Sequence, residues 1–225
     1  GHGAVPVAKK LETLGCDMLA VACLAEAAQL RDAGITLPIL CLGYTPVEET
    51  EALLRYHVTQ TVGDLDTDRD LSEAAQKAGG VLDVHVKLDT GMGRYGFLPQ
   101  ETAEAAALLQ ALPALRVEGV FTHLSDAANA KCTALQYRRF TEGVRILQEA
   151  GIDTGLRHVC ASTAFLRYPE MQLDAVRLGS ALLGRLSVPD PLGLEKIGWL
   201  ETQIMELKDL PSGWQVGYAG AYRTK

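Results

Sequence analysis

The 225-residue sequence lacks the features that mark several classes of protein. It has no uninterrupted run of 18 apolar residues, which argues against a membrane-spanning helix, and no signal peptide is visible. Positive charge is scarce, because 21 lysines and arginines stand against 28 acidic residues, a formal net charge of −7. We therefore expect a cytoplasmic protein that binds neither nucleic acid nor an anionic membrane surface.

Cysteine and histidine are also sparse, and neither shows the spacing of a metal site. The five cysteines include no C-x-x-C pair, and the five histidines include no H-x-x-x-H pair. We expect free thiols in a reducing compartment and no structural metal.

The sequence does contain a regular alternation of two kinds of segment, one typical of strands and one typical of helices. Seven short apolar runs have the composition of β-strands and lie at residues 17–24, 38–43, 57–62, 81–88, 115–124, 155–162 and 174–184. Stretches rich in Ala, Leu and Glu with helical spacing lie between them, at residues 7–15, 25–34, 46–56, 71–80, 99–112 and 134–151.

This alternation predicts an α/β fold in which helices connect parallel strands. Seven strands suit either a (β/α)8 TIM barrel that lacks its first strand or a large doubly wound sheet. The barrel is favoured because no G-x-G-x-x-G follows the first predicted strand. We predict an N-terminally incomplete barrel over residues 1–195.

The pattern changes after residue 195. Thr, Gln and Ile alternate from residue 197 onward, a turn is expected at Pro211-Ser212-Gly213, and a second run follows it. We predict two antiparallel strands and assign residues 196–225 to the beginning of a second, β-rich domain.

Polar residues at the carboxyl ends of barrel strands are informative because barrel active sites form there. His85, Lys87 and Asp89 share one face of the strand 81–88, and Arg94 follows in a glycine-rich turn. A buried lysine must be paired, neutralised or modified. The alternative is structural: an ion pair between Lys87 and Asp89, or between Arg94 and another carboxylate.

Two further strand ends carry polar groups. His123 ends the strand 115–124 beside Phe121, where a hydrogen-bonded core histidine is the simpler interpretation. Ser162 and Thr163 stand at the expected start of a helix, where hydroxyls are either N-caps or anion ligands.

The last predicted strand is interrupted by Arg177, which needs an acceptor, and Gly179 and Ser180 then open a short helical turn. Barrels form phosphate sites at this point of the fold. Two arginines, histidines, a buried lysine and small-residue turns suit a phosphorylated, aromatic, anionic cofactor, and pyridoxal 5′-phosphate is the natural candidate.

Four segments resemble the successive signatures of the alanine racemase family. They are VKLDTGMGRYGF (86–97), GVFTHLSDA (119–127), HVCAS (158–162) and AVRLGSALLGRL (175–186). The segment YAGAYRTK (218–225) is similar to the first strands of the family's C-terminal β domain. The resemblance spans essentially the whole chain and implies a TIM-barrel isomerase that uses pyridoxal phosphate to interconvert L- and D-alanine for peptidoglycan.

The resemblance also implies roles for individual residues. Arg94 would contact the cofactor's phenolic oxygen and the substrate carboxylate, and His123 would lie against the pyridine ring. The residues implied to hold the phosphate are Ser162, Gly179 and Ser180. Two supporting residues are implied as well: Lys87, which is carbamylated in many members, and His158, which braces Arg177.

Arg177 is implied to face the pyridine nitrogen. Arginine stays protonated at any usual pH and cannot accept a proton, so the ring nitrogen should remain unprotonated. That weakens the cofactor as an electron sink and favours racemisation over transamination.

The family's two proton-transfer residues are not expected within this sequence. The resemblance places the Schiff-base lysine five residues before Gly1 and the catalytic tyrosine after Lys225, so no catalytic residue is retained and the chain alone should be inactive. The longer protein would be a homodimer acting on a small amino acid.

Some positions depart from the family pattern. Ala161 replaces a common Asn, and Ser180 replaces a larger apolar residue, which puts the substrate preference in doubt. The segment RLGSALLGRL (177–186) also resembles membrane-linked serine/alanine racemases, which leaves serine open as a substrate beside alanine. A barrel that binds pyridoxal phosphate without catalysis, and a related decarboxylase of basic amino acids, are further alternatives.

Overall fold

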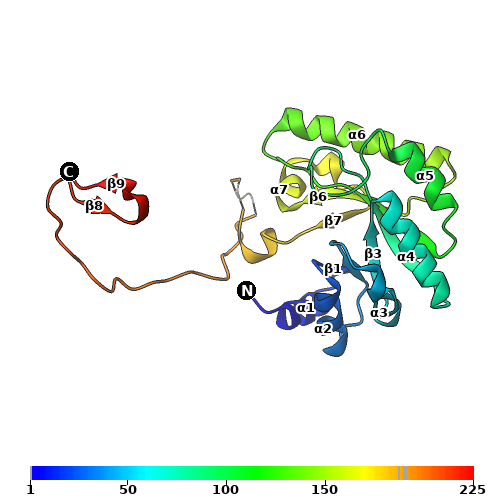
Figure 1. Cartoon of the computed structure of the whole chain (residues 1–225), viewed down its shortest axis with the longest axis horizontal. Helices are drawn as coiled ribbons and strands as arrows, with labels where there is room; N and C mark the ends of the chain where they lie inside the picture. Colours follow the sequence, from blue (N-terminus) through cyan, green and yellow to red (C-terminus); the bar gives the residue numbers. More distant parts are fainter. Residues whose placement is uncertain (1, 187, 190–191) are drawn as a thin grey trace.

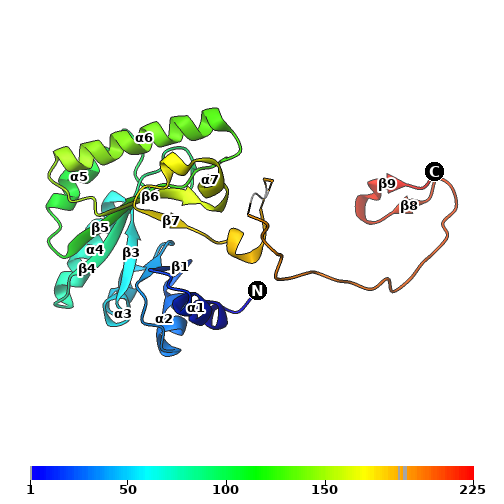
Figure 2. The ribbon, with the colours of Figure 1, turned by 180° about the vertical axis from the view of Figure 1, so that it is seen from behind.

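The computed structural model describes residues 2–186, 188–189 and 192–225. Over these ranges, seven parallel strands form one sheet in the order β1-β2-β3-β4-β5-β6-β7, with a helix between each pair of consecutive strands. Figures 1 and 2 show the sheet curving into a nearly closed barrel with the helices outside it. The predicted α/β barrel is thus confirmed, and β1 and β7 form its two edges.

The strands are shorter than the apolar runs that predicted them. Their bounds are β1 Leu19–Val21, β2 Ile39–Cys41, β3 Val58–Val62, β4 Leu82–Lys87, β5 Leu115–Phe121, β6 Leu156–Ala161 and β7 Ala175–Arg177. Because β5 ends at Phe121 and β7 at Arg177, His123 and Gly179 follow their strands instead of lying within them.

The helices alternate with the strands as expected. Their bounds are α1 Ala4–Thr13, α2 Leu24–Asp32, α3 Thr50–Arg55, α4 Leu65–Lys77, α5 Thr102–Gln110, α6 Ala130–Glu149 and α7 Ser162–Arg167. Short 3-10 turns lie at Val47–Glu49, Pro169–Met171, Ala181–Leu183 and Tyr218–Gly220. Among the described residues, no helix has the length and apolarity needed to span a bilayer.

The core lies between the outer face of the sheet and the helices. Along β4 and just beyond it, Val84, Val86 and Leu88 are buried against this layer, as alternation along a strand requires. The intervening His85 and Lys87 are equally buried but point to the barrel interior. The barrel centre is therefore polar at this level.

Two of the helices that begin earlier than their apolar periodicity indicates have a polar side-chain cap. α4 starts at Leu65 and not at residue 71, because the Asp64 carboxylate accepts a hydrogen bond of 2.9 Å from the Thr67 N–H. α6 starts at Ala130 and not at residue 134, because the Asn129 side chain accepts from two backbone N–H groups of the first turn. Polar capping residues, and not apolar ones, set both boundaries.

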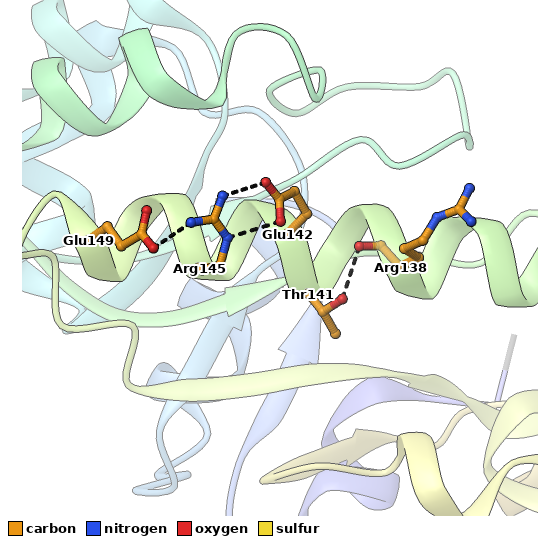
Figure 3. A network of polar contacts seen from close by, with 5 residues as sticks. All are labelled: Arg138, Thr141, Glu142, Arg145 and Glu149. Atoms are coloured by element: carbon orange, nitrogen blue, oxygen red, sulfur yellow. Dashed lines mark hydrogen bonds and ion pairs between the residues drawn. The ribbon is translucent and has the colours of Figure 1, made fainter.

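The outer face of α6 is charged (Figure 3). Arg145 pairs with Glu142 at 2.6 Å and also with Glu149, one turn on either side along the helix. All three side chains are about half exposed or more. Such pairs keep a helix face soluble and contribute little to stability.

The C-terminal segment differs from the prediction. In the described part of residues 196–210 no strand forms, whereas a strand was expected there. The antiparallel pair lies wholly after the Pro211–Gly213 turn, between β8 Gln215–Val216 and β9 Tyr222–Arg223. An extended segment separates this hairpin from the barrel (Figure 1), so the Thr, Gln and Ile alternation finds no neighbouring strand to pair with.

Candidate functional site

A cavity of about 620 Å³ opens at the carboxyl ends of β5, β6 and β7. Six side chains or glycines that the sequence analysis singled out from four separate segments line it: Arg94, His123, Ser162, Arg177, Gly179 and Ser180. Segments distant in sequence therefore converge at one place. Lys87 and His158 lie behind the cavity wall and are nearly fully buried.

The loop that carries Arg94 is built on Asp89. This carboxylate accepts hydrogen bonds of 2.8–3.1 Å from the backbone N–H groups of four consecutive residues, Gly91 to Arg94. Burial raises its pKa, but these hydrogen bonds outweigh burial and leave the pKa below its ordinary value. The Asp89 carboxylate thus accepts hydrogen bonds from the backbone of the following loop, and the alternative of a Lys87–Asp89 ion pair is wrong.

Gly96 lets this loop pack against the end of β4. Its φ is +110°, and a Cβ there would lie 2.8 Å from the Lys87 carbonyl oxygen. Both features exclude other residues. The Lys87 carbonyl instead accepts from the Phe97 N–H at 2.9 Å, which closes the loop.

Lys87 is fully buried without a carboxylate partner among the described residues. Its Nζ donates to the Tyr95 carbonyl at 2.5 Å and lies 4.7 Å from the centre of the Tyr95 ring. Burial, opposed by Asp89 and reinforced by Arg94 and Arg177, lowers the pKa of Lys87 to about 8. The amine is therefore partly neutral near physiological pH, and the guanidinium of Arg94 lies over the same tyrosine ring.

Arg177 is held by four hydrogen bonds. Nη1 donates to His158 Nδ1 at 2.7 Å and to the His158 carbonyl at 3.1 Å, and Nη2 donates to the carbonyls of Thr122 and Val159. Its Nε–H makes no hydrogen bond within the described residues and remains for a ligand in the cavity. Burial lowers the pKa of Arg177 to about 10, so the guanidinium is still charged at pH 7.

His158 connects Arg177 to a second buried histidine. Its Nε2 lies 2.9 Å from His85 Nδ1, and its ring stacks on Phe121 at a centroid distance of 4.8 Å. Burial, with the charge of Arg177, lowers the pKa of His158 to about 2 and that of His85 to about 4. Both rings are neutral at pH 7. The sequence placed His85 in the barrel but gave no sign of this contact.

Ser162 joins the last two strand ends. It begins α7 as expected, yet it does not cap that helix; its Oγ accepts from the N–H groups of Gly179 and Ala181, at 3.2 and 3.1 Å. Because the oxygen acts as acceptor here, its O–H is left to donate into the cavity. Ser180, at the exposed turn between these N–H groups, lines the same wall.

His123 is half-buried at the cavity edge, with its carbonyl accepting from Gln136. Burial and then the charges of Arg177, Arg94 and Lys87 lower the pKa of His123 to about 4. The imidazole is neutral at pH 7 and can lie against a flat ring without adding charge.

The sequence analysis missed two parts of the cavity wall. The loop at residues 124–128 contributes Asp126, whose carboxylate accepts from the Ala128 N–H at 3.0 Å, and Leu42 lies just past the end of β2. Leu42 could have been found by its place after a predicted strand, and residues 124–127 lie within the segment 119–127 that resembles the family, although no role was assigned to them. With two arginines, three serines, one threonine and one carboxylate among the described lining residues, the cavity suits an anionic ligand.

Residues 1–187 match the family model described as the N-terminal domain of alanine racemase. The chain belongs to the alanine racemase family. It is 40% identical over 230 residues to the alanine racemase of Desulfovibrio desulfuricans and 37% identical over 232 residues to that of Methanococcus maripaludis. In both comparisons the whole chain is covered, together with 62% of the relative's length.

Solved alanine racemases share the fold. The enzyme from Clostridium difficile 630 superposes with a TM-score of 0.82 at 38% identity, over 100% of this chain and 60% of that one. The Bacillus anthracis enzyme with bound L-Ala-P superposes with a TM-score of 0.84 at 33% identity, again over 100% and 60%. The chain thus spans about three fifths of the length of the alanine racemases that it matches.

Proposed function

We propose that this chain forms the cofactor-binding barrel of a pyridoxal-phosphate-dependent alanine racemase that interconverts L- and D-alanine. The observation that carries the proposal is the convergence of Arg94, His123, Ser162, Arg177 and the Gly179-Ser180 turn on a single cavity. The family relationship supports the same activity.

The donors in the cavity match the groups of pyridoxal phosphate. The O–H groups of Ser162 and Ser180 and the turn at Gly179 would hold the phosphate, and the Nε–H of Arg177 would donate to the pyridine nitrogen. His123, being neutral, would lie against the ring. When bound, the cofactor supplies an electron-withdrawing ring that makes the Cα proton of an amino acid removable.

Arg177 holds the ring nitrogen in one protonation state. A guanidinium that donates four hydrogen bonds to the protein and keeps a pKa near 10 can give a hydrogen bond at Nε but cannot take a proton there. The ring nitrogen of a bound cofactor would therefore stay unprotonated, which would favour racemisation over transamination. Arg94, an exposed residue that lines the same cavity, would bind the phenolic oxygen and the substrate carboxylate.

Lys87 is proposed to be carbamylated. Its neutral amine would attack the carbon of CO₂, forming an N–C bond while one C=O π bond becomes a carboxylate, and the nitrogen would release a proton to solvent. The buried group then becomes an anion near Arg94 and can orient that guanidinium. Absence of a ¹³C carbamate signal after incubation with ¹³C-bicarbonate would count against this step.

The remaining features of the longer protein are also proposals. Residues 1–195 form the barrel and residues 196–225 begin a β domain; the protein acts as a homodimer in the cytoplasm and supplies D-alanine for peptidoglycan. None of the 225 residues is assigned proton transfer with substrate.

Binding is tested by calorimetry of the 225-residue chain with pyridoxine 5′-phosphate, which lacks the aldehyde and so cannot react with lysines. We expect saturable binding that Ser162→Ala weakens about tenfold, the loss typical of one hydrogen bond to a charged group. Thr141→Ala, on the outer face of α6, is the control. Equal affinity of all three proteins would argue against this phosphate site.

Activity is tested in a chimera in which the chain replaces the matching part of the C. difficile alanine racemase. We expect racemisation of alanine, with serine assayed in parallel because Ala161 and Ser180 depart from the family pattern. A folded, dimeric chimera that racemises neither amino acid would contradict the proposed function.

A further inference from the structure

Two buried histidines and Arg177 form an unbranched hydrogen-bonded chain beneath the cavity. Arg177 Nη1 lies 2.7 Å from His158 Nδ1, and His158 Nε2 lies 2.9 Å from His85 Nδ1. His85 is 1% exposed and His158 is 3% exposed, so water does not replace these contacts. The fourth ring nitrogen, His85 Nε2, is buried and has no hydrogen-bond partner among the residues that the structure describes.

The chemistry of Arg177 fixes the direction of every hydrogen bond in this chain. A guanidinium has only donors, so His158 Nδ1 must accept and the single proton of that neutral ring must be on Nε2. His158 Nε2 then donates, His85 Nδ1 must accept, and the proton of His85 is on its own Nε2. The partnerless nitrogen of His85 is therefore an N–H donor.

We propose that His85 is a positioning residue, which by accepting from His158 Nε2–H holds the His158 ring in the orientation that anchors Arg177 beneath the cavity. This role rests on the proposed function, because it matters most if the Nε–H of Arg177 meets the cofactor ring. Neither ring contacts the cavity, so His85 acts through His158 and Arg177.

The space for His85 is provided by its neighbour on β5. His85 pairs with Gly119 in the sheet, and a Cβ at Gly119 would lie 2.5 Å from His85 Cε1. Any larger residue would displace the imidazole from His158. The strand pair thus holds the ring in place, although one ring N–H remains buried and unsatisfied, a costly feature that a purely structural site would avoid.

The chain of tautomers is measured directly by two-bond ¹H–¹⁵N correlation NMR on the ¹⁵N-histidine-labelled protein at pH 7, without cofactor. We expect His85 and His158 both to be neutral with the proton on Nε2, and the His158 Nε2–H to be protected from exchange. A proton on Nδ1 of either ring, or two protons on His158, would overturn the inference.

The positioning role is measured with two nearly isosteric variants. In His85→Asn the amide oxygen takes the place of Nδ1 as acceptor, whereas His85→Leu leaves the His158 N–H without one. We expect His85→Leu to raise the dissociation constant for pyridoxine 5′-phosphate about tenfold and to abolish protection of the His158 N–H. His85→Asn should retain both within about threefold.

The control is His57→Asn, an exposed histidine whose positive φ of 49° asparagine tolerates. Wild-type affinity in His85→Leu would overturn the role of His85. If His85→Leu fails to fold, a tenfold loss of affinity for pyridoxine 5′-phosphate in a folded His85→Asn would also overturn the role of His85. If the wild-type chain shows the expected tautomers but binds no pyridoxine 5′-phosphate, the proposed function fails and the tautomer assignment stands.

Discussion

At the scale of one residue, Arg177 determines which neighbouring nitrogen atoms carry protons, because its guanidinium can only donate hydrogen bonds. With no acceptor atom, it imposes the protonation pattern of the two histidines behind it and of any ring nitrogen in front of it. The four acceptors that bind its guanidinium make this half-buried cation tolerable in the barrel.

Replacing Arg177 by Glu exchanges a hydrogen-bond donor for an acceptor at this position. In the chimera, we expect Arg177→Glu to lower the rate of alanine racemisation at least tenfold and to raise transamination, because a carboxylate accepts a hydrogen bond from a protonated ring nitrogen. Circular dichroism of the alanine and an assay for pyruvate measure the two products. An unchanged ratio of racemisation to transamination would refute the role given to this arginine.

The buried histidines also make stability depend on pH. Burial lowers the pKa of His85 from 6.5 to about 4, so as the pH falls through this window the unfolded chain binds a proton that the folded chain does not. The stability present above pH 6.5 is thus lost on acidification. Asp68 acts in the opposite sense, because burial raises its pKa to about 7 and its contribution is lost as the pH rises.

Comparison with a variant isolates the histidine effect, since the contribution of Asp68 is common to both proteins. The free energy of unfolding should fall in both proteins when the pH is lowered from 7.5 to 5. We expect the fall to be about 2 kcal/mol smaller in His85→Asn than in the wild type. Urea denaturation at the two pH values measures the difference. Identical losses would show that His85 is not neutral in the folded state at pH 5.

Individual site residues could be predicted where a charged side chain stands in an otherwise apolar strand. Lys87 and Arg177 interrupt apolar strands, which marked them in the sequence, and the structure brings Arg177 to the cavity. Their partners were not predictable. Asp89 could equally have paired with Lys87, and only the positive-φ glycines that fold the following turn back onto its carboxylate decide otherwise.

At the scale of elements, the ends of helices depend on caps more than on apolar periodicity. The periodic pattern of α4 begins near Leu71, but Asp64 extends the helix by almost two turns. We expect Asp64→Ala to lower the free energy of unfolding by about 1 kcal/mol, because the Thr67 N–H loses its acceptor. Asp64→Ser, which keeps an acceptor, should lie within a few tenths of wild type. Chemical denaturation of the three proteins decides; equal losses in both variants would contradict a capping role.

The strand expected near residue 200 does not form because it has no neighbouring strand to pair with in the part of the chain that the structure describes. Alternation of Thr, Gln and Ile favours an extended backbone, but a strand needs a neighbour with which to exchange hydrogen bonds. In the barrel each short strand has such a neighbour in sequence order, so the strand predictions succeed there. The segment after residue 195 has none among the described residues, and only the local hairpin β8–β9 pairs.

At the scale of the whole molecule, the order of strands is what turns scattered polar residues into one site. Because each parallel strand lies beside the next in sequence, the loops after β4 to β7 gather at one end of the barrel. The fold class and the residues at strand ends could therefore be predicted together from the sequence. The depth of the cavity, the loop at residues 124–128 and the histidine chain depend on side-chain packing and required the structure.

The most direct test of this account is a crystal structure of the chain with pyridoxine 5′-phosphate. We expect the phosphate to contact Ser162, Gly179 and Ser180, with the pyridine nitrogen within hydrogen-bond distance of Arg177 Nε and the ring beside His123. A ligand bound elsewhere, or bound in this cavity with its phosphate at Arg177, would contradict the proposed cofactor site.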